Sequence, residues 1–166
     1  ELLIFLQCLK NNSYPSKEFL YLIKKYRAIF AELNNISLKF LYQKDEGIYD
    51  AINKAINNIF SSYVIICGAG DSVELNTINK FILQNNDPFL VNIFNTKFRF
   101  SKKIIKSPKG YRLAFFNICQ QSILYKTTIL KKFKFNNLYK IQADYFWNLK
   151  YLRFIPYKYH DEVLGI

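Results

Sequence analysis

The chain has 166 residues and a formal net charge of +12, and 51% of its residues are hydrophobic and 18% aromatic. The length corresponds to one domain, and this apolar content excludes a disordered chain. No run of about eighteen apolar residues occurs, which argues against a transmembrane helix. The charge favours anionic partners such as phosphate-bearing substrates, nucleic acid or an acidic membrane face, although a composition rich in Lys and Asn also produces it.

Three cysteines, Cys8, Cys67 and Cys119, lie far apart in apolar surroundings. No CxxC pair or Cys/His cluster accompanies them, so neither a disulfide framework nor a structural zinc site is indicated, and a cytoplasmic location is expected. The sequence contains no methionine, not even at position 1. We therefore expect residues 1–166 to form a single domain that is incomplete at its N-terminus.

Strand and helix patterns alternate along the first part of the chain. We expect a strand at 2–6, a helix at 16–33, a strand at 37–42 and a turn at 44–47. The next helix has the clearest pattern, because one apolar stripe follows helical spacing: Ile48, Ala51, Ile52, Ala55, Ile56, Ile59 and Phe60. The polar face opposite this stripe contains Asp50, Asn53, Lys54 and Asn57.

The second part begins with an apolar run that reads as a strand buried on both faces. The expected elements are a strand at 63–67, a helix at 73–84, a hairpin or two strands within 88–105, a short strand at 122–125, helices at 127–133 and 143–154, and a short strand at 154–159. This order predicts an α/β fold with a Rossmann-like, mixed, mostly parallel sheet flanked by helices. Ligands of such sheets bind beyond the carboxyl ends of the strands.

One candidate site directly follows the buried strand, in the turn Gly68-Ala69-Gly70-Asp71-Ser72. The glycines allow a ligand to approach the backbone. Asp71 is able to hold Mg²⁺ or Mn²⁺, ions that bind one or two protein carboxylates and complete their shell with substrate phosphates and water. The structural alternative is a turn residue that caps the following helix.

Two further candidates lie at helix N-termini, where backbone amides and the helix dipole favour negative charge. In the segment 44–54, Lys54 offers positive charge to a phosphate; the alternative is a solvated polar face. Asp144 opens the last helix, and an ionised carboxylate there can take a proton from an acceptor hydroxyl. The alternative is a first-turn acid that only stabilises the start of its helix.

Taken together, these segments resemble glycosyltransferase family 2, which has the GT-A fold. KDEGIYDAINKAI is similar to the family segment of the type D-K-G-I-Y-D-A-M-N-K-G-I, and YVIICGAGDS stands where the family has a strand ending in an acidic metal motif. CQQSILY takes the place of a C-H-Q-S segment, and ADYFWNL that of an A-D-Y-D segment. The resemblance covers residues 44 to about 152.

The resemblance implies a role for each matching residue. Asp71 would bind the metal and the diphosphate, with Mn²⁺ or Mg²⁺ as cofactor, and Asp144 would be the catalytic base. Gln121 would line the acceptor or donor-sugar side. The residues that would border the nucleotide-sugar donor are Gly47, which permits close approach, Asp50, Asn53, Lys54 and Gly70.

The chain departs from the family pattern at identifiable places. No T-V-T-x-N-like motif, which contacts the nucleotide base in the family, is found, and the segment 1–16 has no aspartate where the family's second strand ends in one. Gly70 replaces the first acid of the metal motif, and Gln120 replaces the histidine. A catalytically inactive GT-A domain that acts as a binding or assembly module is therefore the alternative function.

The expected activity is metal-dependent transfer of a sugar, with inversion, from a nucleotide-diphosphate sugar to a glycan or lipid-linked hydroxyl in polysaccharide biosynthesis. A peripheral contact with the inner face of the membrane is a further expectation. Nucleic acid is not expected as a partner, because no nucleic-acid-binding motif or lysine-dense helix supports it.

Overall fold

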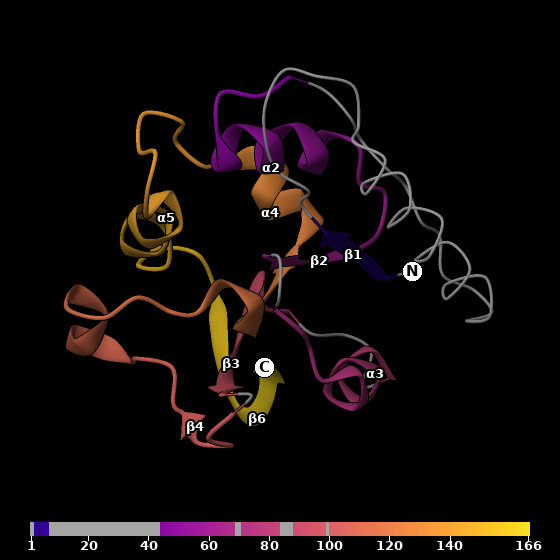
Figure 1. The fold of residues 1–166 in the computed structure, drawn as a ribbon, viewed down its shortest axis with the longest axis vertical. Helices are drawn as coiled ribbons and strands as arrows, with labels where there is room; N and C mark the ends of the chain where they lie inside the picture. Colours follow the sequence, from indigo (N-terminus) through magenta and orange to yellow (C-terminus); the bar gives the residue numbers. More distant parts are fainter. Residues whose placement is uncertain (1, 7–43, 69–70, 84–87, 99) are drawn as a thin grey trace.

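A computed structural model describes residues 2–6, 44–68, 71–83, 88–98 and 100–166 of the chain (Figure 1). The helix expected at 16–33, the strand expected at 37–42 and Gly70 lie outside the described residues. The described helices and strands are, in chain order, β1 (Leu2–Leu6), α2 (Ile48–Asn57), β2 (Tyr63–Cys67), α3 (Leu75–Leu83), β3 (Val91–Lys97), β4 (Ile104–Ile105), the 3₁₀ helices η1 (Gly110–Ala114) and η2 (Gln120–Ser122), β5 (Ile123–Lys126), α4 (Thr127–Lys132), α5 (Ala143–Tyr151) and β6 (Tyr157–Gly165).

The described strands form one mixed sheet in the order β1-β2-β5-β3-β4, with β6 paired to β3. β1 is parallel to β2 and β6 is parallel to β3, whereas the pairs β2–β5, β5–β3 and β3–β4 are antiparallel. The predicted α/β fold with a mixed sheet flanked by helices is confirmed. The three antiparallel pairs arise because β4 folds back on β3 as a hairpin and β5 runs between β2 and β3 in the opposite direction.

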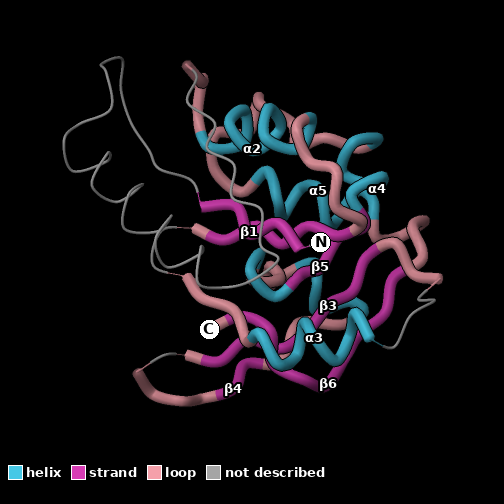
Figure 2. Tube along the Cα trace, turned by 90° about the vertical axis from the view of Figure 1, so that its right-hand side faces the viewer, coloured by secondary structure: helices cyan, strands magenta, loops and turns pink. Residues whose placement is uncertain are grey.

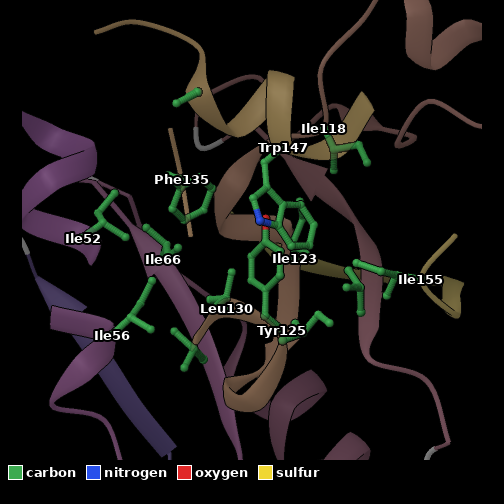
Figure 3. Packing of buried hydrophobic residues seen from close by; sticks show 14 of the residues in the cluster. Ile52, Ile56, Ile66, Ile118, Ile123, Tyr125, Leu130, Phe135, Trp147 and Ile155 are labelled. Carbon is green, nitrogen blue, oxygen red and sulfur yellow. The ribbon is translucent and has the colours of Figure 1, made fainter. Parts of the chain in front are cut away.

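Helices cover both faces of this sheet (Figures 1 and 2). α2, α4 and α5 share one apolar cluster with the sheet, in which the Tyr125 and Trp147 rings meet edge to face with centroids 5.3 Å apart (Figure 3). α3 covers the opposite face with Ile78 and Phe81. β2 contributes to both clusters, since Val64 and Ile66 belong to the first and Ile65 and Cys67 to the second. This arrangement explains the unbroken apolar run of β2.

The apolar stripe predicted for α2 is confirmed in its centre and wrong at its ends. Ile52, Ala55, Ile56 and Ile59 are buried, but the Ile48 side chain is 36% exposed and Phe60 is 85% exposed. α2 ends at Asn57, so Phe60 no longer follows helical spacing. The predicted position of Asn53 on a solvated face is also wrong, because this side chain is only 8% exposed.

The C-terminal part differs most from the prediction. α5 ends at Tyr151, earlier than expected, and β6 is a strand of nine residues where only a short strand was predicted. The end of β6 also bridges to the segment after Asp71 through Val73 and Gly165. None of the described helices combines the length and the apolar character that crossing a membrane requires.

Candidate active site

Asp144 lies in the first turn of α5, half-buried, and both of its carboxylate oxygens accept a hydrogen bond. The Tyr49 hydroxyl donates to Oδ1 over 2.7 Å, and Asn117 Nδ2 donates to Oδ2 over 2.7 Å. Gln142, two residues before Asp144, adopts a left-handed conformation with φ 63°. Such a backbone costs a residue other than glycine about 1–3 kcal/mol and is enriched at functional sites. The carboxylate is thus fixed by side chains from two distant parts of the chain.

Asn117 is itself held in place by its neighbours. Its Oδ1 accepts hydrogen bonds from the backbone N–H of Ile118 over 2.9 Å and from Asn148 Nδ2 over 3.1 Å. Asn148 is fully buried one turn after Asp144 on the same helix. The sequence carries no signal for Asn117, whereas Tyr49 lies inside the segment 44–54 already singled out.

Tyr49 connects the start of α2 to Asp144. Its ring is buried and packs against Phe135, with ring centroids 5.6 Å apart. Burial, followed by the hydrogen bond to Asp144, raises the pKa of Tyr49 to about 12. The hydroxyl therefore keeps its proton near neutral pH and remains a donor to the carboxylate.

The polar residues around the start of α2 bind one another. Lys54 Nζ donates to Asp50 Oδ2 over 2.6 Å and to the Lys44 carbonyl over 2.7 Å. The hydrogen bond from Lys54 is the main cause that lowers the pKa of Asp50. Gly47 begins the helix with φ 138°, a conformation that side chains rarely adopt, and open space surrounds the position of a Cβ there. The charge of Lys54 is thus already partly compensated by Asp50.

Asn53 has a clear structural task. Its side chain donates to the Phe135 carbonyl over 2.8 Å and accepts from the Phe135 N–H over 3.0 Å. It also donates to Asn137 Oδ1 over 2.9 Å. This polar side chain is buried because the segment around Phe135 covers it and satisfies its hydrogen bonds.

A shallow, open depression lies where α2 begins. Its lining comes from the start of α2 and from the loop before α5, and consists of Glu46, Gly47, Ile48, Tyr49, Asp50, Asn137, Tyr139 and Lys140. Lys140 Nζ donates to the Glu46 carbonyl over 3.0 Å and so closes one rim. Through Tyr49 the depression adjoins Asp144.

Asp71 occupies a different environment. It is exposed beyond the carboxyl end of β2, and its Oδ2 accepts the Gly68 N–H over 2.8 Å. Within the described residues no hydrogen bond or ion pair joins Asp71 to Asp144. The carboxylate thus closes its own turn, as the structural alternative predicted, although it caps Gly68 rather than the following helix.

The donor set around Asp71 determines which metal it suits. In the part of the chain that the structure describes, no group of three or more His, Cys, Asp or Glu residues is placed to hold a metal ion. A site made entirely of protein side chains is therefore not formed there. A single carboxylate still fits Mg²⁺ or Mn²⁺ when substrate phosphates and water supply the other ligands.

Gln121 lies in η2 and packs against the end of β6. A Cβ added to Gly165 would lie 2.6 Å from Gln121 Cγ, so the two residues are in tight contact. The neighbouring Ile166 exchanges two backbone hydrogen bonds with Ser72, over 3.1 and 2.8 Å. The end of β6, which the sequence did not predict, therefore brings the turn of Asp71 and Gln121 into one neighbourhood.

No protein-family model matches the chain, and no curated protein matches it by sequence. Solved structures do match it in fold. The crystal structure of S. aureus TarS 1-349 aligns with a TM-score of 0.62 and 17% identity, over 90% of this chain and 47% of that chain. The same protein in complex with UDP-GlcNAc aligns with a TM-score of 0.63 and 16% identity, over 90% and 46% of the two chains.

The TarS structure in complex with UDP aligns with a TM-score of 0.61 and 18% identity, over 90% of this chain and 47% of that chain. The chain thus spans about half the length of these structures. TarS is a glycosyltransferase of the GT-A type. At this level of identity the likeness concerns the fold, and the chain has a glycosyltransferase-like fold.

Proposed function

We propose that the protein is a glycosyltransferase of the family 2 type. It moves a sugar from a nucleotide-diphosphate sugar to a hydroxyl of a glycan or lipid-linked acceptor, with inversion at the anomeric carbon. The observation that carries the proposal is the geometry at Asp144. Tyr49 from the GIYDAINKAI segment, Asn117 from the stretch before CQQS and the start of the ADYFWNL helix meet at this one carboxylate.

In this mechanism Asp144 is the general base. One carboxylate oxygen accepts the proton of the acceptor hydroxyl as the hydroxyl oxygen forms its bond to the anomeric carbon. The bond between that carbon and the diphosphate oxygen breaks, and its electron pair leaves with the nucleoside diphosphate. Tyr49 and Asn117 each occupy one lone pair of the carboxylate, so each oxygen keeps a second one for the incoming proton.

In the proposed mechanism Asp71 acts on the leaving-group side of the reaction. A Mn²⁺ or Mg²⁺ ion held by Asp71 and the donor phosphates would neutralise the charge that develops on the departing diphosphate. Gly47, Asp50, Lys54 and Gly70 border the donor on this proposal, and Gln121 lines the sugar or acceptor side. Asn53 contributes by holding the segment at Phe135 that packs against Tyr49.

The donor class is supported by the complexes of the structural neighbour. TarS structures contain UDP and UDP-GlcNAc, which makes UDP the first nucleotide to test. Calorimetry of the protein with UDP or GDP, with and without Mn²⁺, is the experiment. We expect binding that Mn²⁺ strengthens. Equal affinity in both conditions would contradict the role of the metal, and absence of binding would favour an inactive binding module.

A further inference from the structure

The net positive charge of the chain comes from residues 88–143. Residues 88–143 contain twelve of the 24 Lys and Arg residues and none of the 12 acids, so the rest of the chain is neutral. Within this segment, residues 98 and 100–116 also carry exposed aromatic side chains. We propose that residues 98 and 100–116, the basic-aromatic segment, dock on a membrane surface that carries anionic lipid headgroups.

The apolar side chains of the basic-aromatic segment are unusually exposed. Phe100 is 99% exposed and Tyr111 is 82% exposed. The other exposed large apolar residues of the segment are Phe98, Ile104, Phe115 and Phe116. Its exposed cations are Lys102, Lys103, Lys106, Lys109 and Arg112. Exposed apolar surface of this extent along one short segment is typical of an interaction site.

The base of the basic-aromatic segment is anchored to the sheet. Ser107 Oγ donates to the Phe94 carbonyl over 2.6 Å, and the Tyr159 hydroxyl donates to the Pro108 carbonyl. The chain is buried again at Ile118. Between these points it runs out to the left edge of the molecule in Figure 1, away from α2 and α3. The stretch that carries the exposed residues Tyr111, Phe115 and Phe116 is thus held at both ends.

The chemistry of the basic-aromatic segment matches an anionic bilayer surface. Phe and Ile side chains enter the boundary between headgroups and acyl chains, and Lys and Arg extend their charged ends to the lipid phosphates. No acid within residues 88–143 opposes this attraction. Nucleic acid is the less favoured partner, because the sequence shows no nucleic-acid-binding motif. The proposal does not depend on sugar transfer.

The test is co-sedimentation of the protein with phosphatidylcholine vesicles, with and without phosphatidylglycerol. We expect binding only when phosphatidylglycerol is present. Lys102→Glu/Lys103→Glu should weaken it at least tenfold, since each basic residue near an anionic surface contributes about fivefold in affinity. Lys80→Glu/Lys158→Glu, which changes the net charge equally with exposed residues outside the segment, is the control and should bind almost normally.

A second pair of variants tests the aromatic contribution. Phe100→Ser should lower vesicle affinity, whereas Phe60→Ser, which also removes an exposed phenyl ring, should not. Equal effects of segment and control variants would overturn the proposal. It would also be overturned by tighter binding to DNA than to vesicles, or by segment variants that change only the oligomeric state in ultracentrifugation. UDP binding, measured separately, reports on the transferase proposal alone.

Discussion

Asp144 and Asp71 are the two carboxylates expected to share the chemistry, and their surroundings differ. Asp144 is half-buried and is held by two side chains from distant parts of the chain. Asp71 is exposed and binds only the backbone of its own turn among the described residues. A base must be aimed before the reaction, whereas a metal ligand completes its site with the substrate phosphates. The fixed position of Asp144 therefore suits a catalytic base, and the open position of Asp71 suits a metal ligand.

The largest expected effect is on catalysis at Asp144. Asp144→Asn keeps the shape of the side chain but cannot take the hydroxyl proton, so turnover should fall roughly 10²–10⁴-fold. Affinity for UDP should barely change, because the base contacts the acceptor. Sugar transfer and thermal unfolding measured on the same preparations check this. Near-normal transfer would remove Asp144 from the mechanism and reduce it to a first-turn acid.

The next effect is expected at Asn53, which holds the Phe135 segment that packs against Tyr49. Asn53→Ala leaves the N–H and the carbonyl of Phe135 without their partners, which should lower the free energy of unfolding by about 2–4 kcal/mol. Asn57→Ala on the same helix is the matched control, since Asn57 is exposed, and should change it by less than about 0.5 kcal/mol. Similar denaturation midpoints for the two variants would show that the hydrogen bonds of Asn53 do not stabilise the fold.

The Tyr49→Phe variant tests whether the Tyr49 hydroxyl positions the Asp144 carboxylate. The ring packing is kept and the donor to Asp144 is lost, so kcat should fall about tenfold with KM nearly unchanged, as expected for a hydrogen bond to a charged group. Tyr139→Phe, which also changes a lining residue of the depression, is the control for steady-state kinetics. An unchanged kcat for Tyr49→Phe would exclude the positioning role.

The stability of Tyr49→Phe should also differ from that of the wild type in alkaline solution. Because the pKa of Tyr49 is raised from 10.0 to about 12 in the folded protein, its stabilising contribution is complete below pH 10 and is lost as the pH rises towards 12. The free energy of unfolding of the wild type should therefore fall more steeply over this range than that of Tyr49→Phe. Parallel pH profiles in denaturant titrations would contradict the raised pKa.

The smallest structural effect is expected at Asp71. Asp71→Asn can still accept the Gly68 N–H, so the free energy of unfolding should change by less than about 0.5 kcal/mol. The strengthening of UDP binding by Mn²⁺ should nevertheless disappear. Asp161→Asn, another exposed aspartate, should keep it. A Mn²⁺ effect that survives Asp71→Asn in calorimetry would place the metal elsewhere.

Local sequence patterns predicted much of the fold, because the spacing of apolar residues in many elements reflects which side of the element is buried. The apolar run of β2 reflects burial on both faces, and the centre of α2 follows helical spacing. β6 was underestimated because Asp161 and Glu162, exposed in its middle, interrupt the apolar pattern. Asn53 was misplaced because the segment that buries it lies 82 residues further along the chain.

The candidate site was predictable only in part. Asp144 and the segment 44–54 stood out through their residue types and order. The bond between Tyr49 and Asp144 spans 95 positions, and periodicity carries no information at that distance. Asn117 had no local signal at all. The roles toward a substrate stay predictions for all the candidate residues: Gly47, Asp50, Asn53, Lys54, Gly70, Asp71, Gln121 and Asp144.

The most direct test of the proposed mechanism is a crystal structure of the protein with UDP and Mg²⁺. We expect the diphosphate beside Asp71, with Mg²⁺ about 2.0–2.1 Å from the carboxylate. Asp144 should face the same cleft, on the side where the donor sugar and acceptor hydroxyl would meet. A nucleotide bound away from Asp71, or an Asp144 carboxylate separated from the nucleotide by protein, would contradict it.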